Sequence, residues 1–216
     1  FLTYLETERR NTVRSRNARL AAVRAFAHYV ALQCPPALQL MQQILAIPMK
    51  RFEKPLLGFL SRDEVQALLA APDITTWCGL RDRMMLTLLY NTGARVSEMI
   101  GIRVADVTLA ATSSVRLRGK GRKQRTVPLW KETAVEIGHW LKYTDLRSDQ
   151  PIVPTRKGLP MTRTNVADRL TLAITAASKQ CPQMVGRNIS PHTWRHTTAM
   201  HLLQAGVDIT VIALWL

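Results

Sequence analysis

The sequence predicts a mainly α-helical protein with a small antiparallel β-sheet, an α+β fold. Three observations lead to this prediction. Apolar residues recur at helical spacing over much of the chain, two short segments alternate as strands do, and a glycine-rich basic turn joins those two segments. Hydrophobic residues make up 47% of the 216 residues, so the chain has enough apolar surface for a packed core.

Residues 12–31 form the first long predicted helix. Its apolar face is expected to consist of Leu20, Val23, Phe26, Ala27 and Val30. Its other face carries four arginines, Arg14, Arg16, Arg19 and Arg24. A basic face is most often only solvated, but in a chain with this excess of positive charge we expect these arginines to contact a DNA backbone. Helices are also expected at residues 1–10 and 37–46.

Residues 51–60 have the character of a linker, because Pro48 and Pro55 bracket a short basic stretch. We therefore expect residues 1–50 to belong to one helical domain and residues 61–216 to form a second. The second domain opens with Ser61-Arg-Asp-Glu64, which fits a capping box. Its further predicted elements are helices at 79–91, 95–99, 131–144, 163–178, 191–205 and 208–216, and strands at 113–118 and 125–129.

The charge of the chain indicates a polyanionic partner. Thirty Lys and Arg residues oppose fifteen Asp and Glu, which gives a formal net charge of +15 and a pI of about 10.7. Neutralising phosphates releases counterions and favours binding, but this does not choose between DNA and RNA. The cysteines Cys34, Cys78 and Cys181 are widely spaced, which favours a reducing compartment over a disulfide framework. No apolar run reaches the length of a membrane span and no signal-peptide pattern opens the chain, so we expect a cytoplasmic protein.

Three motifs contain residue types that handle phosphate. They are Asn91-Thr-Gly-Ala-Arg95-Val-Ser-Glu98, Gly119-Lys120-Gly121-Arg122-Lys123-Gln-Arg125-Thr-Val-Pro128-Leu, and Ser190-Pro191-His192-Thr-Trp-Arg195-His196. Each motif also has a simpler interpretation. Arg95 could pair with Glu98, three residues later on a helix. Lys120 could be a solubilising residue of a turn, and His192 and Arg195 could hydrogen-bond to carbonyl groups.

Together the motifs supply the groups that metal-free phosphoryl transfer needs. The guanidiniums of Arg95 and Arg195 can clamp the non-bridging oxygens of a phosphodiester as negative charge develops on them. His192 can hydrogen-bond the same phosphate or move a proton, and Lys120 can protonate the departing 5′ oxygen. His192 and His196 also have the spacing of a zinc pair, but no glutamate lies between them and no nearby Cys or Asp completes a site. We therefore expect no metal and no cofactor.

The three motifs occur in the order and at about the separations found in tyrosine recombinases, and the chain resembles this family over nearly its whole length. The similarity is greatest to bacterial Xer recombinases, phage integrases and transposon-borne integrases. The resemblance implies a helical core-binding domain followed by a catalytic domain. It also implies that Arg95 and Arg195 bind the scissile phosphate and that Glu98 supports Arg95.

The resemblance assigns His192 as an acid, base or hydrogen-bond donor and Lys120 as the general acid toward the 5′-hydroxyl leaving group. Arg122 and Lys123, in the same turn as Lys120, are further candidates for DNA contact. Family members form a covalent 3′-phosphotyrosine, exchange strands through a Holliday junction, use no metal or ATP, and assemble as tetramers on double-stranded DNA.

The family pattern continues past Leu216, where the nucleophilic tyrosine is expected. The tyrosines that are present all precede the third motif, and none is assigned as the nucleophile: Tyr4, Tyr29, Tyr90 and Tyr143. We therefore expect a chain that is shortened at both ends, binds DNA and cannot cleave it. The full-length parent is expected to be an active site-specific recombinase, integrase or transposase.

Three other functions remain open. A non-catalytic DNA-binding protein could keep an integrase-like scaffold, although such a scaffold has no need of two arginines, a histidine and a lysine in these motifs. A type IB topoisomerase shares the chemistry, but the arginine-rich helix at residues 12–31 favours a recombinase. An RNA-binding protein is disfavoured because aromatic residues are only 6% of the chain and no stacking motif is present.

Overall fold

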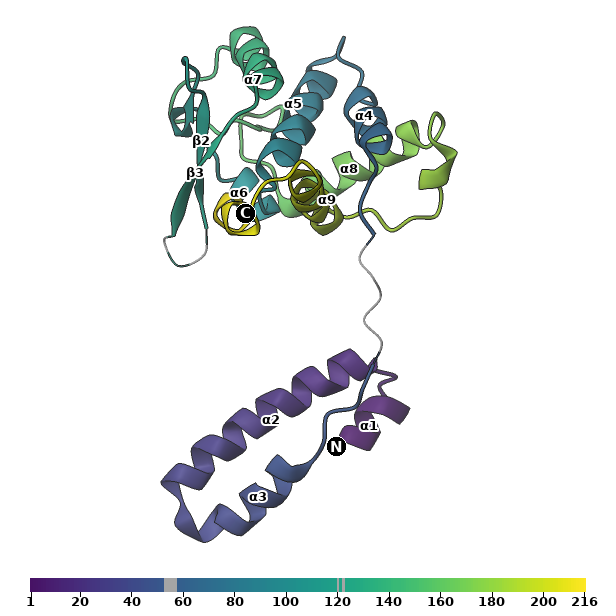
Figure 1. Cartoon of the computed structure of the whole chain (residues 1–216), viewed down its shortest axis with the longest axis vertical. Coiled ribbons are helices and arrows are strands. Elements are labelled where there is room, and N and C mark those ends of the chain that lie inside the picture. Colours follow the sequence, from purple (N-terminus) through teal and green to yellow (C-terminus); the bar gives the residue numbers. More distant parts are fainter. Residues whose placement is uncertain (53–57, 120, 122) are drawn as a thin grey trace. The chain divides into compact units, whose positions relative to one another are not determined.

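The computed structural model describes residues 1–52, 58–119, 121 and 123–216. The chain divides into two compact units, Phe1–Leu56 (the first unit) and Leu57–Leu216 (the second unit). Both units are built mainly of helices, and within the described residues the only β-sheet lies in the second unit (Figure 1). The predicted fold class, mainly α with a small antiparallel sheet, is therefore confirmed. Residues 53–57 of the expected linker lie outside the described residues.

The described residues of the first unit form three α-helices, α1 (Leu2–Thr7), α2 (Val13–Gln33) and α3 (Leu38–Ala46), with a short 3-10 helix at Pro35–Ala37 between the last two. Helix α2 begins where the side chain of Thr12 accepts a hydrogen bond from the main-chain N–H of Ser15, an ordinary N-cap. Helix α3 packs along α2 (Figure 1), and α1 packs against α2 near its N-terminal end. The buried apolar residues of this unit are Leu5, Leu20, Ala27 and Met41.

The predicted orientation of α2 is wrong at two positions. Leu20 and Ala27 are buried as expected, but the side chain of Phe26 is 66% exposed. Arg16 was expected on the solvent-facing side and is instead buried, because it precedes Leu20 by four residues and shares its face. Its guanidinium lies 3.4 Å from a carboxylate oxygen of Glu6 and donates to the main-chain oxygen of Pro48 at 3.1 Å. Arg16 therefore holds the first unit together and is withdrawn from the candidate DNA contacts.

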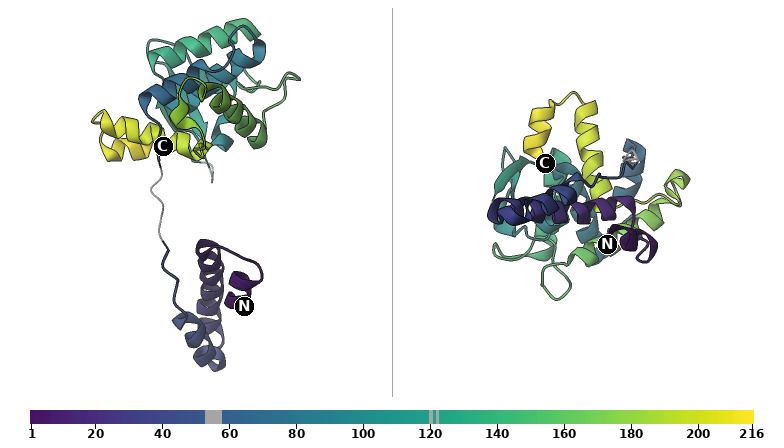
Figure 2. Two further views of the ribbon diagram at one scale, coloured as in Figure 1. Left: turned by 90° about the vertical axis from the view of Figure 1, so that its right-hand side faces the viewer. Right: turned by 90° about the horizontal axis from the view of Figure 1, so that it is seen from below.

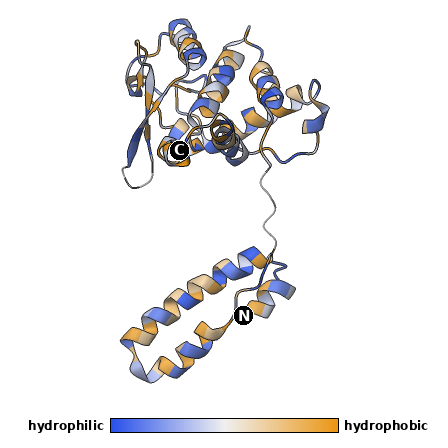
Figure 3. Ribbon diagram, viewed as in Figure 1, coloured by the Kyte–Doolittle hydropathy of each residue, from blue (hydrophilic) through white to orange (hydrophobic). Residues whose placement is uncertain are grey.

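The other three arginines of α2 remain available to solvent. Arg14 and Arg19 are exposed and Arg24 is half-buried. Hydrophobic and hydrophilic residues are interspersed along α2 (Figure 3), as suits a helix that packs on one side only.

Among its described residues, the second unit has seven α-helices. They are α4 (Arg62–Ala70), α5 (Trp77–Thr92), α6 (Val96–Met99), α7 (Lys131–Thr144), α8 (Arg163–Ala177), α9 (Pro191–Gln204) and α10 (Ile209–Trp215). The predicted capping box before α4 is present, since Ser61 and Glu64 each accept the other's main-chain N–H. The predicted helices all occur; those of the second unit have ends that differ from prediction by at most two residues, whereas the helix predicted at residues 1–10 ends three residues early, at Thr7. No helix among the described residues is long and apolar enough to span a membrane.

The sheet has three antiparallel strands in the order β1 (Val107–Thr108), β2 (Ser114–Arg118) and β3 (Gln124–Pro128). Strands β2 and β3 form the predicted hairpin, in which Val115 pairs with Val127 and Leu117 with Arg125. Val115, Leu117 and Val127 are buried, so one face of the hairpin belongs to the core. Strand β1 was not predicted, because two residues are too few to show an alternating pattern.

Helix α5 is the centre of the second unit. It packs against α7 on one side, against α4 and α9 on others, and α8 packs against α4 (Figure 1). Met84, Met85 and Leu88 of α5 are almost inaccessible to solvent, as their spacing predicted. Helices α9 and α10 lie next to each other at the C-terminal end of the chain, as both views of Figure 2 show. This packing brings the ends of α5 and α10 close to α6 and β3.

Candidate active site

The end of α5 determines where Arg95 lies. Helix α5 stops at Gly93, which has a left-handed conformation (φ 55°) and donates its main-chain N–H to Leu89 at 2.9 Å. The left-handed conformation favours glycine at this position, and a Cβ atom there would also displace the side chain of Leu216, whose Cδ2 would lie only 2.2 Å away. Two residues later, Arg95 caps α6, and its side chain is 56% exposed.

Glu98 organises the arginines around it. Its side chain is buried and accepts the main-chain N–H of Arg95 at 3.0 Å, the Arg95 guanidinium at 2.9 Å and the Arg125 guanidinium at 2.9 Å. Burial by itself would raise the pKa of Glu98, but these hydrogen bonds and the charge of Arg125 outweigh it and lower the pKa to about 2. Glu98 is therefore a permanent anion at neutral pH. The simple ion pair expected between Arg95 and Glu98 is present, and it is part of a larger cluster.

Arg195 reaches the same cluster from α9. Helix α9 begins at Ser190, which caps it through the main-chain N–H of Thr193, and has proline in its first turn. The guanidinium of Arg195 donates to the main-chain oxygen of Gly93 at 2.6 Å and to that of Leu216 at 2.5 Å. Burial lowers the pKa of Arg195, and the positive charges of Arg95 and Arg125 lower it further. Three guanidiniums thus lie close enough together to repel one another.

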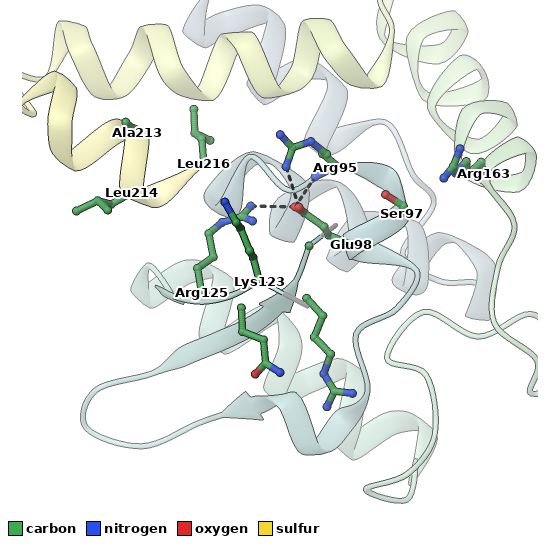
Figure 4. A pocket seen from close by; sticks show the side chains of 12 residues that line it. Arg95, Ser97, Glu98, Lys123, Arg125, Arg163, Ala213, Leu214 and Leu216 are labelled. Carbon is green, nitrogen blue, oxygen red and sulfur yellow. Dashed lines mark hydrogen bonds and ion pairs between the residues drawn. The ribbon is translucent and has the colours of Figure 1, made fainter. Parts of the chain in front are cut away.

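Next to this cluster is an open cleft of about 1060 Å³. Among the residues that the structure describes, its basic lining residues are Arg95, Arg118, Lys123, Arg125 and Arg163, and its one acidic lining residue is Glu98. Figure 4 shows Arg95 and Arg125 directed at Glu98, with Lys123 and Leu216 nearby and Arg163 apart from them on α8. Because Glu98 is already neutralised by two arginines, the cleft attracts an anion.

The sequence-predicted site residues fall into three groups. Arg95, Glu98 and Arg195 are brought together by the fold, although about one hundred residues separate the two arginines. His192 is exposed in the first turn of α9, three residues before Arg195, and Lys123 is exposed and lines the cleft. Lys120 and Arg122 lie outside the described residues.

Sequence reasoning missed three arginines of the cleft, Arg118, Arg125 and Arg163. Arg125 lies within the second motif and at the start of the strand predicted at residues 125–129. In the structure it pairs with the buried Leu117, so the two side chains lie on the same face of the sheet. Arg163 carries no signal in the sequence, because it is one basic residue among many at the start of a helix. Arg118 also lines the cleft, but it is already paired with the buried Asp106 at 2.9 Å.

The remaining histidines of α9 make packing contacts. The ring of His196 lies edge-on to Phe59, with ring centres 6.4 Å apart. His201 is buried, and its Nδ1 atom lies 2.6 Å from the hydroxyl of Tyr90. Burial lowers the pKa of His201 and raises that of Tyr90, so both are neutral at physiological pH. No three His, Cys, Asp or Glu side chains are grouped as metal ligands in the part of the chain that the structure describes.

Comparison with known proteins agrees with the resemblance stated from the motifs. Residues 58–216 match the model of the phage integrase family. The chain is 43% identical over 217 residues to the putative integrase/recombinase y4rC of Sinorhizobium fredii, covering 100% of this chain and 65% of the relative. It is 38% identical over 177 residues to the tyrosine recombinase XerD of Pseudomonas aeruginosa, covering 80% and 57%. The chain thus spans less than two thirds of the length of either relative.

Solved structures show the same fold. The Tn1549 transposon integrase in complex with circular intermediate DNA superposes with a TM-score of 0.73 at 17% identity, over 97% of this chain and 73% of that chain. The XerA recombinase superposes with a TM-score of 0.64 at 20% identity, over 100% and 70%. With the fold, the motifs and the family match in agreement, the chain belongs to the phage integrase family, whose members include the tyrosine recombinases.

Proposed function

We propose that this protein, in its full-length form, is a site-specific DNA recombinase or integrase that cuts and rejoins strands through a 3′-phosphotyrosine intermediate. The observation that carries the proposal is that Arg95, held by the buried anion Glu98 at the edge of a basic cleft, lies close enough to Arg195 for their charges to repel each other. Two adjacent guanidiniums can bind both non-bridging oxygens of one phosphodiester and stabilise the charge that develops there.

In this reaction a tyrosine oxygen attacks the phosphorus and the bond to the 5′ oxygen breaks. Arg95 and Arg195 hold the phosphate, and Glu98 keeps Arg95 charged and oriented. His192 hydrogen-bonds the phosphate or moves a proton, and Lys120 gives the departing 5′ oxygen its proton. The phosphate ester bond is exchanged and not hydrolysed, so the reverse step can rejoin the strands without another energy source. The family motifs support the roles of His192 and Lys120.

The partner is double-stranded DNA. The net charge of +15 supports this, as do the relatives: the Tn1549 integrase was solved with circular intermediate DNA. Arg14, Arg19 and Arg24 of α2 are proposed to contact the backbone from a core-binding domain, and Lys123 and Arg122 from the hairpin. The full-length protein is proposed to act as a tetramer on paired sites in the cytoplasm. The 216-residue chain is proposed to bind DNA and to form no covalent adduct, because none of its tyrosines follows the third motif.

A nicked suicide substrate tests the proposal. A form of the protein extended past Leu216 is mixed with nicked duplexes that carry candidate recombination sites, and covalent adducts are separated on denaturing gels. We expect an adduct that forms in EDTA and contains a phosphotyrosine. It should be lost in R95A and R195A, while the 216-residue chain should bind the same duplexes and form none. Tight, salt-sensitive binding without an adduct on any duplex would contradict the proposal. It would instead support a non-catalytic DNA-binding protein with an integrase-like fold.

A further inference from the structure

Arg125, on β3, contacts two different parts of the candidate active site at once. Its Nη2 atom donates to Oε2 of Glu98 at 2.9 Å, and its Nε atom donates to the main-chain oxygen of Trp215, in the last turn of α10, at 2.9 Å. Nε and Nη2 form one edge of the planar guanidinium, so a single rigid group bridges Glu98 and α10. Figure 4 shows Arg125 rising from the hairpin toward Glu98.

The position of Arg125 is fixed by the sheet. It pairs across the hairpin with Leu117, which is fully buried, and its own side chain is only 18% exposed. Long polar side chains lose rotamer freedom on burial, and here the two acceptors offset that cost. Arg125 is therefore a largely buried side chain with two fixed acceptors, unlike a mobile arginine on the surface.

Trp215 is held from a second direction. Its indole N–H donates to the main-chain oxygen of Asn91 at 2.9 Å. The side chain of Asn91, which is completely buried, in turn donates to the main-chain oxygen of Pro128 at 3.1 Å and accepts the main-chain N–H of Trp130 at 2.7 Å. The last turn of α10 is thus tied both to the end of α5 and to β3. A shift of α10 would pull on Arg125 and through it on Glu98.

We infer that Arg125 is a positioning residue that holds Glu98, and through it Arg95, in register with the last turn of α10. The inference rests on the proposed function, in which Arg95 binds the scissile phosphate and the chain beyond α10 carries the nucleophile. Arg125 then sets the distance between the phosphate-binding arginine and the segment that delivers the attacking group. The competing role is a direct contact between Arg125 and a DNA phosphate, since Arg125 also lines the cleft.

The charge-preserving variant R125K separates the two roles. Lysine keeps the positive charge but lacks the planar edge that spans two fixed acceptors. In the extended protein we expect R125K to form the covalent adduct about 100-fold more slowly at saturating DNA, since a misplacement of about 1 Å has a cost of that order. In the 216-residue chain, R125Q should leave the salt dependence of DNA binding unchanged, whereas loss of a direct phosphate contact would reduce the slope by about 0.9. Adduct formation by R125K at the wild-type rate would overturn the inference.

The matched control is R116K. Arg116 lies on the neighbouring strand β2 and also uses Nε and Nη2 together, both directed at the buried Asp106, and it does not line the cleft. R116K should therefore form the adduct at the wild-type rate. If R116K slows the adduct as much as R125K does, the effect belongs to the hairpin as a whole and the inference fails.

Two further measurements connect Arg125 to Glu98. In a double-mutant cycle on the adduct rate, adding R125Q to E98A should slow adduct formation by less than about a further threefold, because E98A has already removed the side-chain acceptor of Arg125. In the 216-residue chain, a carboxylate titration by NMR should find the Glu98 pKa near 2 in the wild type and higher in R125Q. This titration needs no recombination activity. A wild-type protein without an adduct therefore counts against the proposed function, whereas an unchanged Glu98 pKa in R125Q counts against the inference about Arg125.

Discussion

Replacing Glu98 by glutamine should change how the stability of the second unit depends on pH. The pKa of Glu98 is lowered from an ordinary 4.5 to about 2, and one pKa unit corresponds to about 1.4 kcal/mol, so the ionised form stabilises the folded state by about 3 kcal/mol. Because the folded-state pKa is lowered, this stabilisation is complete above pH 4.5 and is lost as the pH falls toward 2. By linkage, about 2 kcal/mol of it disappears between pH 7 and pH 3.

Urea denaturation followed by tryptophan fluorescence measures this loss. The signal reports the second unit alone, because all five tryptophans lie there: Trp77, Trp130, Trp140, Trp194 and Trp215. The free energy of unfolding of the wild type should fall by about 2 kcal/mol more than that of E98Q between pH 7 and pH 3. The control E132Q, which changes an exposed glutamate of α7, should follow the wild type. Parallel losses in wild type and E98Q would show that Glu98 is not held as an anion by Arg95 and Arg125.

Further substitutions test the geometry around the site and the core. G93A and G206A should each lower the free energy of unfolding by about 1 kcal/mol, because both place alanine in a left-handed conformation, and G93A should also displace the side chain of Leu216. W140F should cost about 1–2 kcal/mol more than W194F in urea denaturation. Both side chains are fully buried, but Trp140 donates to a main-chain oxygen at 2.8 Å whereas the Trp194 N–H has no partner among the described residues. An equal cost of W140F and W194F, or a G93A variant as stable as the wild type, would contradict the structure. For DNA binding by the 216-residue chain, the logarithm of the binding constant should fall linearly with the logarithm of the salt concentration, with a slope of about −0.9 per phosphate contacted. A binding constant that does not change with salt would contradict the inference that the positive charge of the chain binds DNA.

Local patterns predicted most of the elements of the second unit. The capping box at Ser61, the helix at residues 131–144 and the basic hairpin all depend on residues that are neighbours in sequence, so their signals are visible without a fold. The errors arose at side chains whose burial depends on residues distant in sequence. Arg16 was expected to face solvent, but the carboxylate of Glu6 and the main-chain oxygen of Pro48 give its charge partners inside the first unit. Phe26 was expected to be buried, and nothing in its own helix shows that its side lacks a partner.

The candidate site was predictable in part. The motifs identified Arg95, Glu98 and Arg195, but the meeting of the two arginines depends on α9 packing against α5, which a single sequence does not show. The bridging role of Arg125 depends on the main chain of α10, ninety residues away, and main-chain acceptors leave no trace in residue identity. Glu98 itself appeared as a helical neighbour of Arg95. The structure shows it as the shared acceptor of two arginines.

The central claim is that Arg95 and Arg195 neutralise the same phosphate, and removing the charge of that phosphate tests it most directly. A suicide substrate with a methylphosphonate at the cleavage position lacks one ionised non-bridging oxygen. With the extended protein, R95A and R195A should be far less defective in adduct formation on this neutral substrate than on the ordinary one, because less charge needs stabilising. The control Y143F, at an exposed tyrosine of α7, should behave as wild type on both substrates. If each arginine variant is equally inactive on both substrates, the two arginines act elsewhere and the account of this site is wrong.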